Sequence, residues 1–163
     1  MRSYLFYCFF ILLLIPVSDY AQQTVDTTEM SATAKLLWKK TYQFTATTVQ
    51  PMTGRERNVA GNNYTLKVSA ASVIADLPYF GKSNTAPIGT SDVGMKFSSL
   101  DFAYSSQELT KSREQVTIKP KDIQDIQEIY LIVYPDGTAD LRISSMNRQP
   151  ISYRGKIEAL QTK

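Results

Sequence analysis

Histidine is absent from the sequence, and cysteine occurs only once, at Cys8. Without histidine, the chain cannot build a Ser-His-Asp triad, a Cys-His pair or a histidine metal site. Cys8 lies in the N-terminal apolar run, so we expect the exported chain to contain no cysteine, which excludes disulfides, a thiol nucleophile and a thiolate-bound metal. Phosphate-binding loops, nucleophile elbows and calcium loops are also missing. We therefore expect no cofactor and no metal, and catalysis would need carboxylates, tyrosines, lysines or serines.

A strong charge of either sign is missing as well. The sequence has 18 basic and 15 acidic residues, which gives a net charge of +3. Nucleic-acid binding needs a clustered basic patch. The densest basic group lies on the last two predicted strands and contains Arg142, Arg148, Arg154 and Lys156. A solvated strand face explains this group better, and we expect no nucleic-acid partner.

The N-terminus has the pattern of a signal peptide. Arg2 precedes an apolar run over residues 4–15, and Ala21 is a suitable cleavage residue. The run is shorter than the roughly 20 apolar residues of a membrane-spanning helix. A lipoprotein would carry its cysteine directly after the run, whereas Cys8 lies inside it. We therefore predict a signal peptide over residues 1–21, a periplasmic or secreted protein, and no membrane span after cleavage.

A polar leader over residues 22–28 should connect to a single β-rich domain over residues 29–160. The domain should open with a helix, for which Asp26 is a plausible N-cap with Glu29 three residues later. One apolar stripe at helical spacing contains Met30, Ala34, Leu37 and Trp38.

Beyond the helix, the apolar residues alternate with polar ones, which is typical of strands. Residues 52–63 and 81–94 are rich in turn residues, and we expect loops there. Strands are predicted at residues 42–51, 64–68, 73–77, 95–107, 114–120, 129–134, 138–145 and 147–157. No second helix is long enough for a βαβ crossover, so the sheet should be antiparallel with one face buried.

The fold class that follows is mainly β (α+β), with an N-terminal helix packed on an antiparallel sheet. A sandwich and a half-barrel of about seven or eight strands both fit. In the strand over residues 95–107, Leu100, Phe102 and Tyr104 should share the buried face. The segment YPDG predicts a type I turn in which Gly137 takes a positive φ as a G1 bulge.

Two pairs of carboxylates deserve a catalytic hypothesis, namely Asp136 with Asp140 and Asp122 with Asp125. Glycosidases use two carboxyl groups about 5 to 9 Å apart in a cleft. All four residues fall in predicted turns or on exposed strand faces, where acidic side chains are usually solvated. A structural role is therefore preferred for them.

The segment ADLPYFGKS carries the first candidate site. Pro78 cannot donate to a strand ladder, so the strand should end or bulge there. Tyr79 and Phe80 then lie on a bend beside the predicted loop over residues 81–94. Such aromatic residues hold apolar or sugar ligands in many β proteins. The alternative is a packed corner in which the rings fill the core.

The segment MNRQPISYRG carries the second candidate site. Arg148 precedes Pro150 at the entry to the last strand, and Tyr153 follows within it. A guanidinium can clamp an anionic group with two hydrogen bonds, or it can hold the chain turn. The predicted ligand-binding residues are therefore Tyr79, Phe80, Arg148 and Tyr153, with a structural role as the alternative.

The motifs LPYFG, TIKPKD and NRQPISYRG occur in this order. With the exported leader and the first helix, the sequence resembles domain-of-unknown-function family 4251, a family of small exported Bacteroidetes proteins. The resemblance covers roughly residues 29–158, and it implies envelope export and a compact β-rich domain without an assigned activity. The chain departs from the family at Lys82, where an arginine is usual, and in lacking a cysteine after the signal sequence.

Three functions remain open. The leading one is a non-catalytic envelope protein that binds a small molecule, a glycan or another envelope protein. The second is a carboxylate-based hydrolase that acts on glycan or cell-wall material. The third is a structural or assembly protein that uses a sheet edge.

Overall fold

The computed structural model describes residues 31–83 and 94–160, in which the chain forms one helix and ten strands. The elements are α1 (Ala32–Lys39), β1 (Tyr42–Pro51), β2 (Arg57–Asn58), β3 (Thr65–Val68), β4 (Val73–Leu77), β5 (Met95–Ser99), β6 (Phe102–Leu109), β7 (Arg113–Pro120), β8 (Ile126–Val133), β9 (Thr138–Ser145) and β10 (Ile151–Ala159). Over these ranges, no helix has the length and apolar content needed to cross a membrane.

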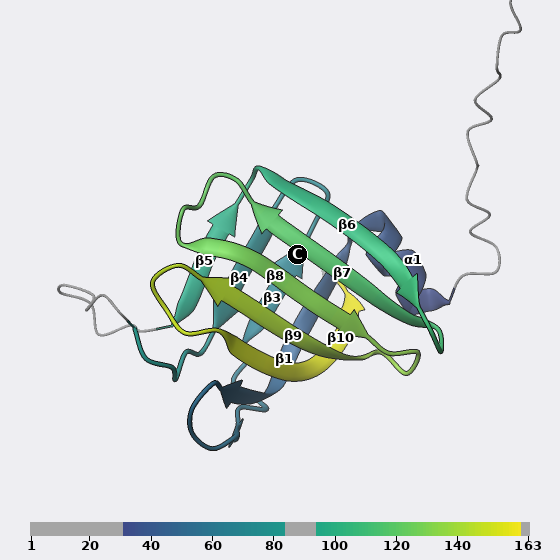
Figure 1. Cartoon of the computed structure of the whole chain (residues 1–163). Helices are drawn as coiled ribbons and strands as arrows, with labels where there is room; N and C mark the ends of the chain where they lie inside the picture. Colours follow the sequence, from purple (N-terminus) through teal and green to yellow (C-terminus); the bar gives the residue numbers. More distant parts are fainter. Residues whose placement is uncertain (1–30, 84–93, 161–163) are drawn as a thin grey trace, which may run out of the picture.

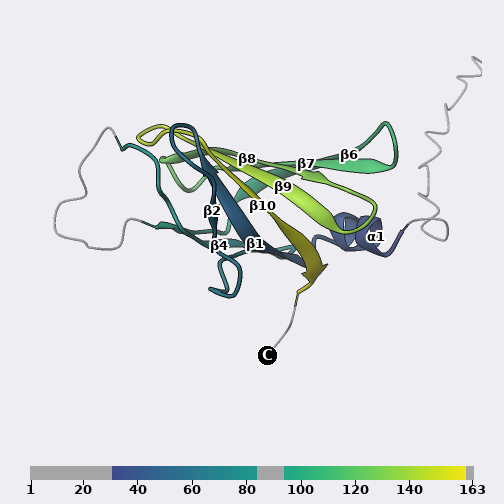
Figure 2. The same cartoon turned by 90° about the horizontal axis from the view of Figure 1, so that it is seen from below.

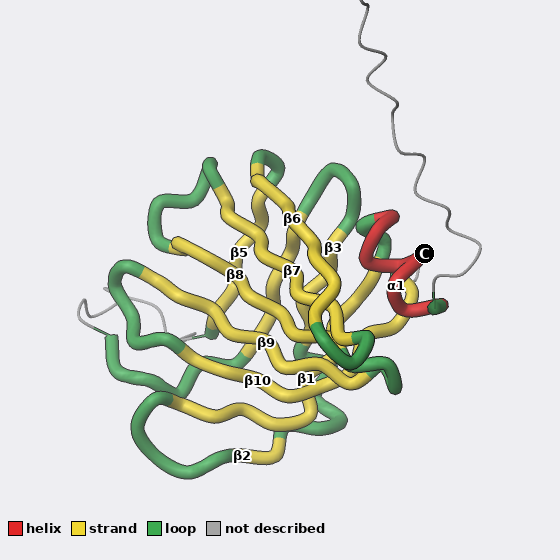
Figure 3. Tube along the Cα trace, turned by 45° about the vertical axis from the view of Figure 1, so that its right-hand side comes forward, coloured by secondary structure: helices red, strands yellow, loops and turns green. Residues whose placement is uncertain are grey.

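All strands belong to one antiparallel sheet with the order β5-β4-β3-β1-β10-β9-β8-β7-β6, and β2 pairs with β1. The sheet folds over so that β6 to β10 form one layer and β1, β3, β4 and β5 form the other (Figures 1 and 2). The helix lies at one end of the layers (Figure 3). The predicted mainly β architecture, with a helix on an antiparallel sheet, is confirmed.

The core lies between the two layers and follows from the alternation of the strands. Buried side chains occupy every second position of β4, β9 and β10. The largest fully buried residues include Tyr42, Phe44, Leu66, Leu77, Ile118, Ile129, Leu131, Leu141, Ile143 and Tyr153. Each Leu, Ile or Phe buried in this way contributes about 1.5–3 kcal/mol. They form a single cluster, so both layers fold around one core.

Helix α1 begins later than the sequence pattern suggests. The hydroxyl of Ser31 accepts a hydrogen bond from the backbone N–H of Ala34 at 3.1 Å, so Ser31 is the N-cap. The predicted cap at Asp26 with Glu29 lies outside the described residues, as does Met30. Leu37 is buried as predicted, but Trp38 is 52% exposed. The prediction for Trp38 was wrong because a helix of this length docks through a narrower stripe.

The predicted strand over residues 95–107 is two strands. It breaks at Leu100 and Asp101, whose backbone N–H groups donate to the Asp122 carboxylate at 2.7 and 3.2 Å. Leu100 is 73% exposed at this corner, whereas Phe102 and Tyr104 pack against the core. The prediction that Leu100 shares their buried face was therefore wrong. The extra break, together with β2, also raises the strand number above the predicted range.

The hairpin between β8 and β9 follows the prediction. The N–H of Gly137 donates to the carbonyl of Tyr134 at 3.0 Å, and the N–H of Tyr134 donates to the carbonyl of Thr138 at 2.9 Å. Gly137 has a φ of 82°. These features confirm a type I turn with a G1 bulge.

A bulge in β1 decides which of its side chains reach the outer face. The register to β10 shifts between Ala46 and Thr48, opposite Gly155. Tyr42, Phe44 and Ala46 point to the core before the bulge, and Val49 does so after it. Because the inward positions change from even to odd numbers, Thr48 is turned outward.

Candidate functional site

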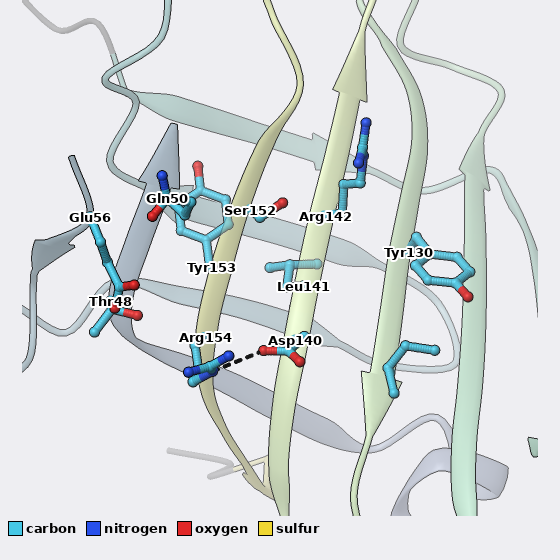
Figure 4. A pocket seen from close by; sticks show the side chains of 11 residues that line it. Thr48, Gln50, Glu56, Tyr130, Asp140, Leu141, Arg142, Ser152, Tyr153 and Arg154 are labelled. Atoms are coloured by element: carbon cyan, nitrogen blue, oxygen red, sulfur yellow. Dashed lines mark hydrogen bonds and ion pairs between the residues drawn. The ribbon is translucent and has the colours of Figure 1, made fainter. Parts of the chain in front are cut away.

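A hollow of about 350 Å³ lies on the outer face of the sheet, across β1, β10, β9 and β8. Its volume is at the lower end of the range for small-molecule sites. Glu56, next to β2, stands on one side, and Tyr130 of β8 lines the other (Figure 4). Ile132 of β8 also lines the hollow. The hollow differs from the corner that the sequence pattern singled out, but Tyr153, one of the predicted site residues, lines it.

Strand register builds the hollow from two rows of side chains. The first row crosses four neighbouring strands and contains Gln50, Ser152, Arg142 and Tyr130. The second row contains Thr48, Arg154, Asp140 and Ile132. Neighbouring strands are about 4.8 Å apart, so each row extends over roughly 14 Å. Four separate segments of the chain therefore supply one continuous surface.

Asp140 organises the second row. Its carboxylate accepts a hydrogen bond from Arg154 Nε at 3.2 Å and another from the hydroxyl of Tyr134 at 2.9 Å. The interaction with Asp140 raises the pKa of the Arg154 guanidinium, and the negative charge of Glu56 raises it further. The same carboxylate raises the pKa of Tyr134. Asp140 and Arg154 thus hold each other in place and balance each other's charge.

Three polar groups that line the hollow, two from the first row and one from the second, are open. The Arg142 guanidinium makes no hydrogen bond or ion pair with any residue in 31–83 or 94–160. The hydroxyls of Ser152 and Thr48 also have no partner within these ranges. All three side chains line the hollow, so a ligand can use donors that the fold itself does not occupy.

The wall formed by β8 is apolar and fixed. Tyr130 and Ile132 are both half-buried. The Tyr130 hydroxyl donates to Gln115 Oε1 at 3.0 Å, which fixes the ring orientation across β7 and β8. An apolar wall opposite open hydrogen-bonding groups is the usual composition of a ligand site.

The sequence-predicted residues meet at another place, the corner where residues 78–83 pass residues 147–149. The Tyr79 hydroxyl donates to the carbonyls of Lys82 at 2.7 Å and Gln149 at 3.1 Å. The Tyr153 hydroxyl donates to the carbonyl of Pro78 at 2.8 Å. Both rings are buried, so their polar tips fasten two chain segments to each other.

Arg148 and Phe80 complete this corner. Arg148 lies over the Tyr79 ring and donates to the carbonyl of Gly94 at 2.9 Å, with Asp125 3.9 Å away. Phe80 is 39% exposed, and the Arg57 guanidinium stacks 4.3 Å from its ring centre. As ligand contacts, the four residues stay a prediction, with Phe80 the most accessible of them.

The candidate carboxylate pairs have structural partners. Asp122 caps the corner between β5 and β6, and Asp125 accepts hydrogen bonds from Ser145 and Asn147 at 2.8 and 3.0 Å. Asp136 accepts from the N–H of Thr138 in the hairpin turn at 2.9 Å. Within the part of the chain that the structure describes, no group of three or more acidic residues could hold a metal ion.

The sequence pattern places Arg142 on a solvated basic face and does not connect it to a site. The outward direction of Arg142, Ser152 and Arg154 follows from alternation in β9 and β10. Their alignment with Thr48 and Gln50 depends on the pairing of β1 with β10, which joins strands more than 100 residues apart. No local pattern carries that information.

Comparisons with known proteins agree on one family. The family model described as domain of unknown function (DUF4251) matches residues 24–157. The chain also resembles the crystal structure of a DUF4251 family protein from Bacteroides eggerthii DSM 20697, with 16% identity and a TM-score of 0.57. This match covers 78% of the chain and 85% of the other protein. At this identity the match supports the shared fold alone, and no curated protein matches the chain.

Proposed function

The chain belongs to the domain-of-unknown-function family DUF4251, and we propose from its hollow that it is a non-catalytic binding protein of the bacterial envelope. The leader over residues 1–21 would be removed on export, which leaves a periplasmic or secreted domain. The bound partner would be a small molecule or a glycan that lies across β1, β10, β9 and β8.

The observation that carries this proposal is the set of open polar groups on the floor of the hollow. Polar groups that are removed from bulk water normally have a hydrogen-bond partner in the protein or an ordered water. Here Thr48 and Ser152 are half-buried, and their hydroxyls have no partner in the described parts of the chain. They lie opposite the apolar wall of Tyr130 and Ile132. A ligand with one polar and one apolar side would satisfy both surfaces.

Saturation-transfer NMR with a library of small polar and aromatic fragments tests the proposal. The informative variant is Ser152→Trp, which fills the hollow from an outward position on β10. The matched control is Phe80→Ala, which alters the exposed ring at the Tyr79 corner. Both variants should keep the β-rich circular dichroism spectrum of the wild type, because neither side chain lies in the core.

We expect fragments that bind the wild type to lose their signal with Ser152→Trp and to keep it with Phe80→Ala. The reverse result would place binding at the corner of Tyr79, Phe80, Arg148 and Tyr153. A library without any binder to the wild type would contradict both versions of the binding proposal.

One observation favours assembly through a sheet edge as a second function. Strand β6 ends the strand order and pairs with β7 from Phe102 to Leu109 without a register shift. It contains no lysine and no proline, the residues that commonly protect edges. The described residues provide no strand on its other side. We therefore propose that β6 can accept a strand from a partner by β-augmentation.

Sedimentation velocity over a wide concentration range tests the edge. Wild type should associate, and the double variant Ser105→Lys, Gln107→Lys should stay monomeric because charges on an edge oppose pairing. The charge control is Thr65→Lys on the interior strand β3. It places a second lysine on this strand near the exposed Lys67. A wild type that stays monomeric at every concentration, alone and with envelope extract, would rule this role out.

A further inference from the structure

We infer that the ligand of the hollow carries a single carboxylate, which Arg142 binds with Ser152 beside it. This inference rests on the proposed binding function and adds the chemical class of the ligand. It follows from the charges of the hollow, from the register of its first row, and from the fixed wall of Tyr130.

The charges of the hollow leave one cation without a counterion. Four charged residues line it, namely Arg142, Arg154, Asp140 and Glu56. The charge of Arg154 is balanced by its ion pair with Asp140 at 3.2 Å. The negative charge of Glu56 also raises the pKa of the Arg154 guanidinium. Arg142 has no acidic partner in residues 31–83 or 94–160. The four charges sum to zero, and the Arg154–Asp140 pair leaves Arg142 and Glu56 on different sides of the hollow (Figure 4). Arg142 therefore offers a local positive charge to a ligand.

Register places the groups that would accompany this charge. Arg142 faces Ser152 on β10 and Tyr130 on β8, so the three residues are direct cross-strand neighbours (Figure 4). A guanidinium binds a planar carboxylate with two parallel hydrogen bonds, and the hydroxyl can donate a third. The Tyr130 ring, held by Gln115, would contact the apolar part of the same molecule.

The surrounding acidic groups select against more highly charged ligands. A phosphate monoester carries close to two negative charges at neutral pH. Asp140 lies two residues from Arg142 on the same strand, about 7 Å along it, and Glu56 lies at the opposite side of the hollow. Because Arg154 balances Asp140, a dianion would meet one open guanidinium and the unpaired carboxylate of Glu56, whereas a monoanion matches the single open guanidinium.

Fluorine NMR of three related probes tests the inference. The probes are 4-fluorobenzoate, its neutral analogue 4-fluorobenzamide, and 4-fluorophenyl phosphate as the dianion. Each is titrated against the purified chain, and the line width of the fluorine signal gives the dissociation constant. We expect the carboxylate to bind about ten-fold or more tightly than the amide, as for a charge-assisted hydrogen bond. The phosphate should bind more weakly than the carboxylate.

Variants assign the effect to Arg142. Arg142→Gln should remove the preference for the carboxylate and leave the affinity for the amide unchanged. Arg142→Lys should keep part of the preference for the carboxylate, because lysine keeps the charge without the planar fork. Lys67→Gln on β3, in the other layer, removes one positive charge far from the hollow and should have no effect.

The possible outcomes separate this inference from the proposed function. Equal binding of benzoate and benzamide, both lost with Ser152→Trp, would overturn the carboxylate and keep the binding hollow. Tighter binding of the phosphate, dependent on Arg142, would replace the monoanion by a dianion. A carboxylate preference that survives Arg142→Gln would place the anion site elsewhere. Absence of binding by all three probes would overturn the inference.

Discussion

At the residue scale, the missing side chain of Gly155 shapes the strand beside the hollow. A Cβ at this position would lie 2.8 Å from Cζ of Phe44 and would clash with the carbonyl oxygen of Thr45. Glycine therefore lets the Phe44 ring pack directly on β10. This contact lies beside the bulge that turns Thr48 toward the hollow.

We predict that Gly155→Ala lowers the free energy of unfolding by about 2 kcal/mol, because the buried ring and the neighbouring backbone must shift. Urea unfolding followed by circular dichroism measures the change. Ser152→Ala, three residues before Gly155 and facing outward, should change stability by less than about 0.5 kcal/mol. Equal stability of the glycine variant and the wild type would show that β10 has room at this position.

The Tyr153 hydroxyl tests whether the Tyr79 corner has a structural role, in which it joins two chain segments. Its hydroxyl is buried and donates to the carbonyl of Pro78. Tyr153→Phe should therefore cost about 1–2 kcal/mol of stability, since it leaves that carbonyl without a donor. Phe80→Leu, a change at the exposed ring, is the comparison and should be nearly neutral. The same urea experiment decides, and a neutral Tyr153→Phe would contradict a structural role for this hydroxyl.

Buried tyrosines also predict how stability depends on alkaline pH. Burial raises the pKa of Tyr104 to about 12, and it also raises the pKa of Tyr42 and Tyr153 above 10. A raised pKa in the folded state means that the stabilising contribution is complete below pH 10, the value of the unfolded chain. It is lost as the pH rises toward the folded value.

The free energy of unfolding should thus fall steadily above pH 10. Tyr104→Phe should remove up to about 2 kcal/mol of that fall between pH 10 and 12. Its own cost at pH 7 should be about 1 kcal/mol, because the Tyr104 hydroxyl donates to the carbonyl of Leu37. Denaturant titrations at pH 7, 10 and 11.5 test both statements. Stability that is constant up to pH 11.5 would show that these hydroxyls ionise without unfolding.

At the element scale, the corner between β5 and β6 depends on one carboxylate. Asp122 accepts hydrogen bonds from the buried Ser99 hydroxyl at 2.5 Å and from the N–H groups of Leu100 and Asp101. The Ser99 hydroxyl and then the Leu100 N–H lower the pKa of Asp122. A lowered folded pKa contributes stability above the unfolded value, and this contribution disappears as the pH falls through the folded value.

Asp122→Asn should therefore lower the melting temperature at pH 7, and the difference from wild type should shrink in acid, where Asp122 of the wild type is itself protonated. Thermal melts at pH 7 and pH 2.5 measure this. Asp101→Asn, which alters only an exposed ion pair with Lys121, should behave like wild type. A difference that grows in acid would have the opposite sign to the one expected here.

Elements that depend on neighbouring residues were predictable from the sequence. The hairpin at Tyr134 to Thr138 follows from its turn residues, and the buried faces of β9 and β10 follow from alternation. The break at Leu100 was not predictable, because the carboxylate that holds it comes from Asp122, beyond two further strands. The outward turn of Thr48 was not predictable either, since the bulge lies in the pairing of β1 with the distant strand β10. Both features depend on contacts between distant segments.

At the scale of the whole molecule, the sequence indicates a helix on an antiparallel sheet but not the strand order. The hollow exists because β1 pairs with β10, which brings the beginning and the end of the domain together. The resemblance to family 4251 predicted the fold, and the family match confirms it. It carried no information about the hollow, although Ser152, Tyr153 and Arg154 of the motif NRQPISYRG line it, because the family has no assigned activity.

The most direct test of the account is an amide chemical-shift map of the labelled chain during a titration with 4-fluorobenzoate. Carboxylate binding in the hollow predicts saturable shifts that are largest at residues 48–50, 130–132, 140–142 and 152–154, and that disappear with Arg142→Gln. Saturable shifts at residues 78–82 and 147–149, or no saturable shifts at all, would contradict it.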